Sequence, residues 1–213
     1  MFSKKAINSY DFLSLPPTSQ TIRNRVGVVR NHFLNAERLH AEDRLELNRN
    51  ISEAPHEGIR EQLEIELHIF GHFFERIHRV STLLIVYSLL ENLMAKVCKY
   101  KAEKHNIEDD IVGYGILSFK PYLENNFGLN FSAPEIEKHW ARVSTLNKLR
   151  NSLAHSEGDL EQYAHFSKDQ CIKLKKTINS TKGLSLYSNT IMISEGFVTQ
   201  SIDAVENLLL AIE

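Results

Sequence analysis

Cysteine is scarce in this sequence: only Cys98 and Cys171 occur among 213 residues. Both fall in segments with a helical pattern, and neither belongs to a paired spacing such as C-x-x-C. The sequence therefore argues against a disulfide framework and against a cysteine zinc site. We expect two reduced thiols, as is usual in the cytoplasm.

The sequence also lacks an excess of charge of either sign and a long apolar run. Its 25 basic and 27 acidic residues give a net charge of −2, which excludes a strongly basic nucleic-acid coat but allows a local basic patch. The longest nearly apolar run, residues 80–90, is too short to cross a bilayer, and residues 1–17 lack the apolar core of a signal peptide. We expect a cytoplasmic protein that does not enter a membrane.

Apolar residues recur at helical spacing along most of the chain, which predicts an all-α fold, an antiparallel helical bundle in a single domain over residues 1–213. Residues 1–20 should be irregular, and residues 21–50 should hold an N-terminal helix. The helix over 80–104 is the most apolar and should be central, with a kink or a short turn at 78–81 where it begins. The other expected helices cover residues 59–79, 117–125, 135–155 and 197–212, with a further one inside 159–179.

Two segments carry more specific patterns. Residues 184–193 alternate with a period of two and have Ser188-Asn189 at their centre, which predicts a small β-hairpin before the last helix. The helix over 59–79 should carry an apolar stripe made of Leu63, Leu67, Phe70, Phe74 and Ile77.

The segment 140–158, WARVSTLNKLRNSLAHSEG, predicts the end of a helix closed by Gly158. A rotation of about 100° per residue places Arg150 inside the apolar side of this helix, with Asn151 and His155 together on the flank. Arginine cannot shed its charge, so a buried arginine needs partners. The apolar side consists of Trp140, Val143, Leu146, Leu149, Leu153 and Ala154.

Arg150, Asn151 and His155 combine a permanent cation, a neutral donor and acceptor, and a group that titrates near neutral pH. This set suits phosphodiester chemistry, because an imidazole can move a proton while a guanidinium holds negative charge on phosphate. A structural role is also compatible with the spacing: Asn151 and His155 could cap a helix end, and Arg150 could form an ion pair. Spacing alone favours the structural role.

The order Arg150-Asn151-x-x-Ala154-His155, followed by Gly158, resembles the R-polar-x-x-x-H motif of the HEPN superfamily of all-helical domains. The resemblance covers residues 59–213. It also includes the segment YSLLENL at 87–93, Trp140 upstream of the motif, and a hairpin before a final helix. One subgroup has a tyrosine two residues after the histidine, where this chain has Glu157, which argues against that subgroup.

The resemblance implies a metal-independent endoribonuclease without a cofactor, with His155 and Arg150 catalytic and Asn151 positioning them. HEPN domains typically form homodimers in which two motifs make one composite site, and the 2′-hydroxyl of RNA attacks to leave a cyclic phosphate. The implied context is a toxin or antiviral defence effector, with an antitoxin or regulatory protein as a further possible partner. The alternative is a non-catalytic HEPN module for dimerisation or RNA binding.

Glu91 lies on the apolar side of its helix together with Tyr87. We expect Glu91 to be a buried acid that contacts Arg150 directly, through Tyr87 or through water. The opposite expectation is that Glu91 reaches solvent at the edge of the bundle, since carboxylates are rarely buried.

Lysines near the motif could form a rim that binds RNA phosphates, although a solvated helix surface would have the same composition. The candidates are Lys148, Lys173, Lys175 and Lys176.

Pairs of metal-binding residues at helical spacing leave a third possibility, a metal-dependent helical oxidoreductase. The pairs are Glu37–His40, Glu75–His78 and His68–His72. The number of E-x-x-H pairs is close to chance, and His68–His72 lacks the central glutamate of a metalloprotease, so we expect no metal.

Overall fold

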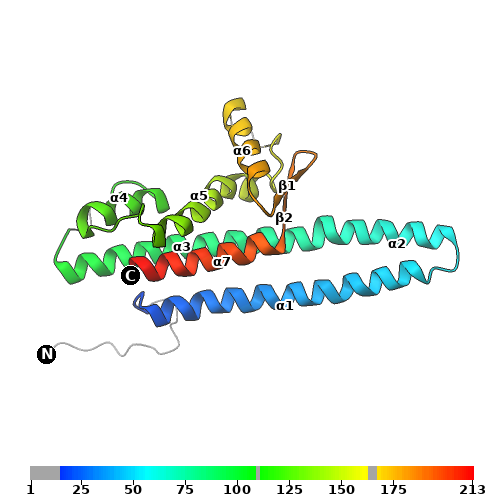
Figure 1. The fold of residues 1–213 in the computed structure, drawn as a ribbon, viewed down its shortest axis with the longest axis horizontal. Coiled ribbons are helices and arrows are strands. Elements are labelled where there is room, and N and C mark those ends of the chain that lie inside the picture. Colours follow the sequence, from blue (N-terminus) through cyan, green and yellow to red (C-terminus); the bar gives the residue numbers. More distant parts are fainter. Residues whose placement is uncertain (1–14, 109–110, 163–166) are drawn as a thin grey trace.

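The computed structural model describes residues 15–108, 111–162 and 167–213 (Figure 1). The all-α prediction is confirmed: the described chain is mainly helical, with one antiparallel two-stranded sheet. Most of the segment expected to be irregular, residues 1–14, lies outside the described residues. The elements are α1 (Ser19–Ser52), α2 (Glu57–Ile69), a π-helix η1 (Phe70–Glu75), α3 (Arg76–His105), α4 (Ile116–Phe127), α5 (Pro134–His155), α6 (Lys168–Ser180), β1 (Leu184–Tyr187), β2 (Thr190–Ile193) and α7 (Glu195–Ile212).

Helices α3 and α7 form the centre of the core. The last helix packs against α5, α3 and α1, and α3 in turn contacts α1, α4 and α5. The apolar positions expected along the last helix are all buried, as the 3.6-residue period predicts. They are Val198, Ile202, Val205, Leu208, Leu209 and Ile212.

The expected kink at 78–81 is wrong, because α2, η1 and α3 follow one another as a single continuous rod. The irregularity lies earlier, in the π-helical turn at 70–75, where backbone hydrogen bonds join residues five apart instead of four. Phe74 and Ile77, expected in the apolar stripe, are 60% and 55% exposed. The periodic pattern correctly marks an apolar side of this helix, but among the described residues no other helix covers it at Phe74 and Ile77.

The far part of α1 and all of α2 project from the bundle as a two-helix hairpin, residues 41–69, which we call the arm (Figure 1). Its two helices pack against each other. The positions that the arm partly buries include Leu47, Ile51, Leu63 and Leu67, while most of its other side chains are exposed. Leu63 and Leu67 thus take the inward position that their spacing predicts.

The continuous rod over residues 57–105 meets the length and composition criteria of a membrane span, and half of its most apolar stretch is buried within the protein. The core helix of a water-soluble bundle meets the same criteria. The absence of a membrane segment therefore stays a prediction.

Helix α5 ends as predicted at His155, and Gly158 closes it. The carbonyl oxygen of Ser152 accepts hydrogen bonds from the backbone N–H groups of Ser156 (3.0 Å) and Gly158 (2.9 Å). Gly158 has φ +80°, and a Cβ there would lie 2.9 Å from Nη2 of Arg76. Both the backbone conformation and the close approach of Arg76 therefore require glycine.

The predicted hairpin forms over 184–193, with Tyr187 opposite Thr190 across the turn. The outer edge of β2 is also bonded, since the N–H of Ile191 donates to the carbonyl of Gly158 (3.0 Å) and the carbonyl of Ile191 accepts from Nε of Arg76 (3.0 Å). Nη2 of Arg76 also donates to the carbonyl of Glu157. Arg76 therefore joins α3 to both the end of α5 and the hairpin.

We expect Gly158→Ala to lower the free energy of unfolding by about 2–4 kcal/mol, since it adds left-handed backbone strain and a contact with Arg76. Gly128→Ala is the matched control, because Gly128 also has a positive φ of 66° but has no other atom within 4 Å of an added Cβ. The control should lose only about 1–2 kcal/mol. Urea unfolding measures both variants. Equal losses would show that the approach of Arg76 does not constrain this turn.

Candidate functional site

Arg150 lies on α5 where this helix packs against α3. Its guanidinium carbon is 5.5 Å from the ring centroid of Tyr87, and its Nη1 donates to Oδ1 of Asn151 (2.9 Å). Arg150 is partly exposed, not buried as its place in the apolar arc suggested. An aromatic face and an amide hold this guanidinium, and neither neutralises its charge.

Tyr87 forms the platform beneath Arg150. It is only 4% exposed, and its hydroxyl donates to Oδ1 of Asn147 (2.5 Å). Burial raises the pKa of Tyr87 to about 12, and the neighbouring Glu91 carboxylate adds to the rise, while the charge of Arg150 opposes it. Tyr87 therefore stays a neutral hydrogen-bond donor at neutral pH.

Glu91 is partly exposed, so the expectation of a buried acid is wrong in degree. It lies beside Tyr87, and an added Cβ on Gly115 would stand 3.0 Å from its Oε1. The position of Glu91 links it to Arg150 through Tyr87. Of the alternatives that the sequence left open, this indirect link is the one that the geometry favours.

His155 is the last residue of α5 and is exposed, one turn beyond Asn151. Ala154, expected on the apolar side, is also exposed. In the last turn of α5, Ser152 and Leu153 are buried, so the apolar stripe ends at Leu153, one residue earlier than its spacing suggested. Exposure leaves the imidazole of His155 accessible to a ligand.

A groove of about 640 Å³ lies between α5 and α6, immediately beside this cluster. Asn147 and Asn151 line it from α5, and Lys173 and Lys176 line it from α6, with Lys148 also on its wall. Three of the four lysines selected from the sequence therefore gather around the motif.

Lys175 is the exception among the four lysines. Its ammonium group donates to Oδ1 of Asn189 in the hairpin turn (2.8 Å), and it does not line the groove. Lys175 thus connects α6 to the hairpin. Asn147 was missed from the sequence, although its position three residues before Arg150 on the same helix was a signal for it.

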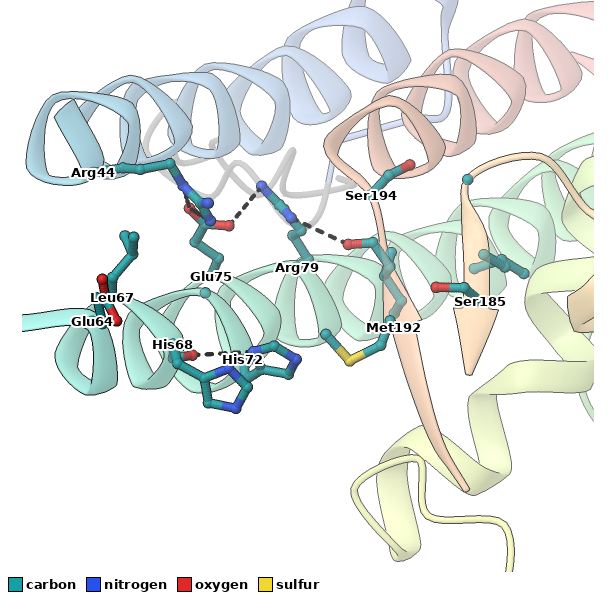
Figure 2. A pocket seen from close by; sticks show the side chains of 14 residues that line it. Arg44, Glu64, Leu67, His68, His72, Glu75, Arg79, Ser185, Met192 and Ser194 are labelled. Atoms are coloured by element: carbon teal, nitrogen blue, oxygen red, sulfur yellow. Dashed lines mark hydrogen bonds and ion pairs between the residues drawn. The ribbon is translucent and has the colours of Figure 1, made fainter. Parts of the chain in front are cut away.

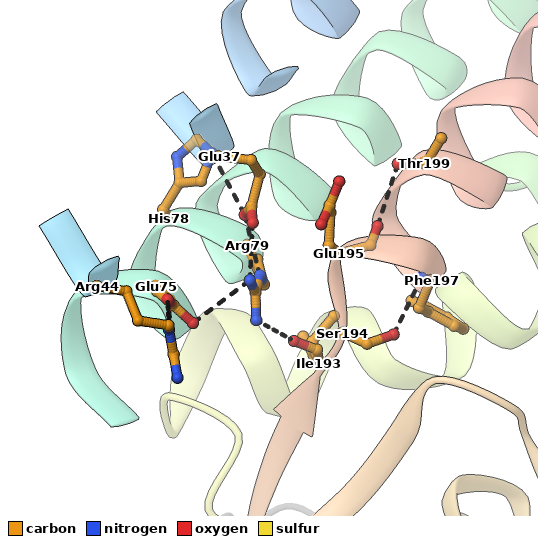
Figure 3. A network of polar contacts seen from close by, with 10 residues as sticks. All are labelled: Glu37, Arg44, Glu75, His78, Arg79, Ile193, Ser194, Glu195, Phe197 and Thr199. Atoms are coloured by element: carbon orange, nitrogen blue, oxygen red, sulfur yellow. Dashed lines mark hydrogen bonds and ion pairs between the residues drawn. The ribbon is translucent and has the colours of Figure 1, made fainter. Parts of the chain in front are cut away.

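The two E-x-x-H pairs come together between α1 and the start of α3, and Figure 3 shows three of their four residues, Glu37, Glu75 and His78. Nε2 of His78 lies 4.0 Å from Glu37, and the His40 and His78 rings are 5.2 Å apart. Arg79 lies between the two carboxylates, with Nη2 2.7 Å from Glu37 and 3.4 Å from Glu75. The guanidinium of Arg79 thus occupies the position between the two carboxylates that the iron ions of a di-iron site would take.

His68 and His72 stack with their ring centroids 3.9 Å apart and line a cavity of about 630 Å³ next to the hairpin (Figure 2). Nδ1 of His72 is 3.1 Å from the carbonyl oxygen of His68. Within the described ranges, no three His, Cys, Asp or Glu side chains are placed to share a metal ion. The geometry gives this pair no third ligand.

Comparison with known proteins adds no relative: no family model, curated protein or solved structure matches this chain. Functional inference therefore rests on the residues and their geometry.

The unfolding of the protein should depend on pH through His78. Burial lowers the pKa of His78, and His40 and His32 act in the same direction, while Glu37 and a hydrogen bond that the His78 ring donates to the backbone at Phe33 oppose the shift. The unfolded chain then binds more protons below its pKa of about 6.5, so stability should be full above that pH and fall as pH drops below it.

His78→Phe keeps an aromatic ring in the place that stacks on Phe33, 5.3 Å away, and removes the titration. Melting temperatures measured between pH 5 and 7.5 should fall less steeply with acid in this variant than in the wild type. Parallel curves would show that His78 takes up its proton equally in both states.

Proposed function

We propose that this protein is a metal-independent endoribonuclease of the HEPN type, which works as a homodimer and serves as a toxin or antiviral defence effector. Arg150 and His155 are the catalytic residues, and Asn151, Tyr87 and Glu91 position Arg150. The proposal combines the motif resemblance with the geometry of the α3–α5 contact.

The observation that carries the proposal is how Arg150 is held. A charged group packed between helices needs polar partners, and Arg79 has a carboxylate in this role, that of Glu37. Arg150 instead has the ring of Tyr87 at 5.5 Å and the amide oxygen of Asn151 at 2.9 Å. This arrangement fixes its orientation and leaves its charge for an anion.

The chemistry then follows from the two groups. The 2′-oxygen of a ribose attacks the adjacent phosphorus, the bond from phosphorus to the 5′-oxygen breaks, and a 2′,3′-cyclic phosphate and a 5′-hydroxyl form. The imidazole of His155 moves the proton, and the guanidinium of Arg150 stabilises the extra negative charge on the phosphate oxygens.

A second copy of the chain has an apolar surface to cover beside this site. On α3, Ile77 and Leu84 lie roughly 60–80° around the helix from Tyr87. Ile77 is 55% exposed and Leu84 is partly exposed. Tyr114, 99% exposed, stands next to the Gly115 that contacts Glu91. Exposed apolar groups on α3 and at Tyr114 support a dimer in which two motifs approach each other.

His155→Ala should fold normally and lose RNA cleavage by roughly 10²–10⁴-fold, because it removes the group that transfers protons. His139→Ala is the control, since it changes the other histidine of α5, near the opposite end of that helix. Cleavage of a labelled RNA, measured with and without EDTA and analysed for cyclic phosphate ends, provides the measurement.

Equal cleavage by the His155→Ala and wild-type proteins would refute the proposal. A wild-type protein that binds RNA but does not cut it under these conditions would favour the non-catalytic HEPN module. Loss of cleavage in EDTA would contradict the metal-independent mechanism.

A composite site predicts complementation between inactive subunits. If Arg150 of one subunit acts with His155 of the other, mixing Arg150→Ala with His155→Ala after joint refolding should restore about a quarter of the wild-type rate. Half of the dimers are then mixed, and each mixed dimer keeps one of the two Arg150–His155 pairs that a wild-type dimer has in its composite site. Light scattering should give the mass of a dimer for each protein. No recovery in a mixture shown to contain mixed dimers would mean that each site lies within one chain.

A further inference from the structure

The groove between α5 and α6 has a chemistry that specifies its ligand. Its wall carries the ammonium groups of Lys148, Lys173 and Lys176, and none of the described side chains that line it is acidic. Leu174, which is 5% exposed, is an apolar residue of the lining. The groove therefore offers three positive charges beside an apolar surface, within the volume range of ordinary ligand pockets.

The side-chain amides of the groove are oriented as donors. The oxygen of Asn147 accepts from the Tyr87 hydroxyl (2.5 Å), and the oxygen of Asn151 accepts from the Arg150 guanidinium (2.9 Å). The oxygen of Gln170 accepts from the backbone N–H of Ser167, the residue that caps the start of α6 (2.9 Å). Each amide thus has its oxygen engaged, which leaves its NH₂ group to donate. Together with the lysines, these groups require an anionic ligand rich in acceptors.

We propose that this groove binds the phosphates of single-stranded RNA next to the bond that is cut, with Lys173 and Lys176 on successive phosphates. These two lysines are neighbours on α6, at a helical spacing of about 5–6 Å between Cβ atoms. Asn151 belongs to both the groove and the Arg150 contact, so a strand in the groove continues to the catalytic pair. This assignment of the ligand rests on the proposed function.

A strand with unpaired bases fits the groove better than a duplex does. Its walls are two helices, and the aliphatic stems of its lysines, together with the edge of Leu174, give a ribose or a base an apolar contact. The donors of Asn147 and Gln170 can also reach carbonyl oxygens on a base edge, which an unpaired base exposes. The groove therefore contributes to the choice of the nucleotide beside the cut as well as to affinity.

The test uses the full chain with His155→Ala, so that RNA binds without being cut. The groove variant Lys173→Gln/Lys176→Gln is compared with Lys168→Gln/Lys175→Gln, which removes the same charge from the same helix outside the groove. Fluorescence anisotropy with a labelled single-stranded RNA of about ten nucleotides gives Kd at several salt concentrations, and circular dichroism confirms that each variant is folded.

The groove variant should lose about 1.4 from the slope of log K against log salt, which corresponds to two contacts on a single strand, and roughly tenfold in affinity at 0.15 M salt. The control should keep the slope of its parent, and Lys173→Arg/Lys176→Arg should restore binding. An unchanged slope in the groove variant, or an equal loss in the control, would overturn the assignment, as would a parent that binds no RNA.

Cleavage assays with His155 intact separate this inference from the proposed function. A chain that cuts RNA while its groove variant binds RNA normally would overturn the groove assignment alone. A wild-type chain that cuts nothing, while the groove variant of its parent still loses RNA binding, would overturn the nuclease and leave the groove as a binding site.

Discussion

Two arginines one turn apart on α3 hold the hairpin and the motif helix in place. Arg76 donates to the carbonyl oxygens of Ile191 and Glu157, and Arg79 donates to that of Ile193. Without these bonds, the carbonyl groups on the outer edge of β2 would have no partner, and an unpaired backbone group that is shielded from water destabilises the fold. By satisfying this edge, the arginines fix the end of α5 against α3, and this contact brings Arg150 onto Tyr87.

The arginines of this protein differ in what remains of their charge. Arg79 is bonded to Glu37 through two nitrogens, at 2.9 and 2.7 Å, so a carboxylate compensates it. Arg76 donates its hydrogen bonds to backbone carbonyl groups, so it links segments of the backbone. Arg150 is oriented by a ring and an amide and is not compensated by either. Arginine thus has three roles in this protein, which depend on its partners: it forms an ion pair, it binds backbone carbonyl groups, and it is a candidate ligand for an anion.

Helix α5, helix α7 and the hairpin could be predicted from the sequence, because their periodicity, Gly158 and the Ser188-Asn189 turn act locally. The π-helical turn and the exposure of Phe74 could not be predicted, because a periodic apolar pattern does not show which other helix packs on the apolar side. The two E-x-x-H pairs do converge, but Arg79 between their carboxylates is visible only in three dimensions. The candidate site divides in the same way: spacing selects Arg150, Asn151 and His155, whereas the role of Asn147 as acceptor for Tyr87, and the turning away of Lys175, depend on tertiary contacts.

The arm gives the molecule an unusual hydrodynamic shape. A continuous helix over residues 57–105 is about 70 Å long at 1.5 Å per residue. A compact protein of 213 residues has a radius of gyration of only about 17 Å, so this helix is much longer than such a protein is wide. An elongated particle diffuses slowly and leaves a sizing column early, so a single copy would imitate a larger assembly. Elution volume therefore overstates the mass of this protein, and its subunit number has to be obtained from methods independent of shape.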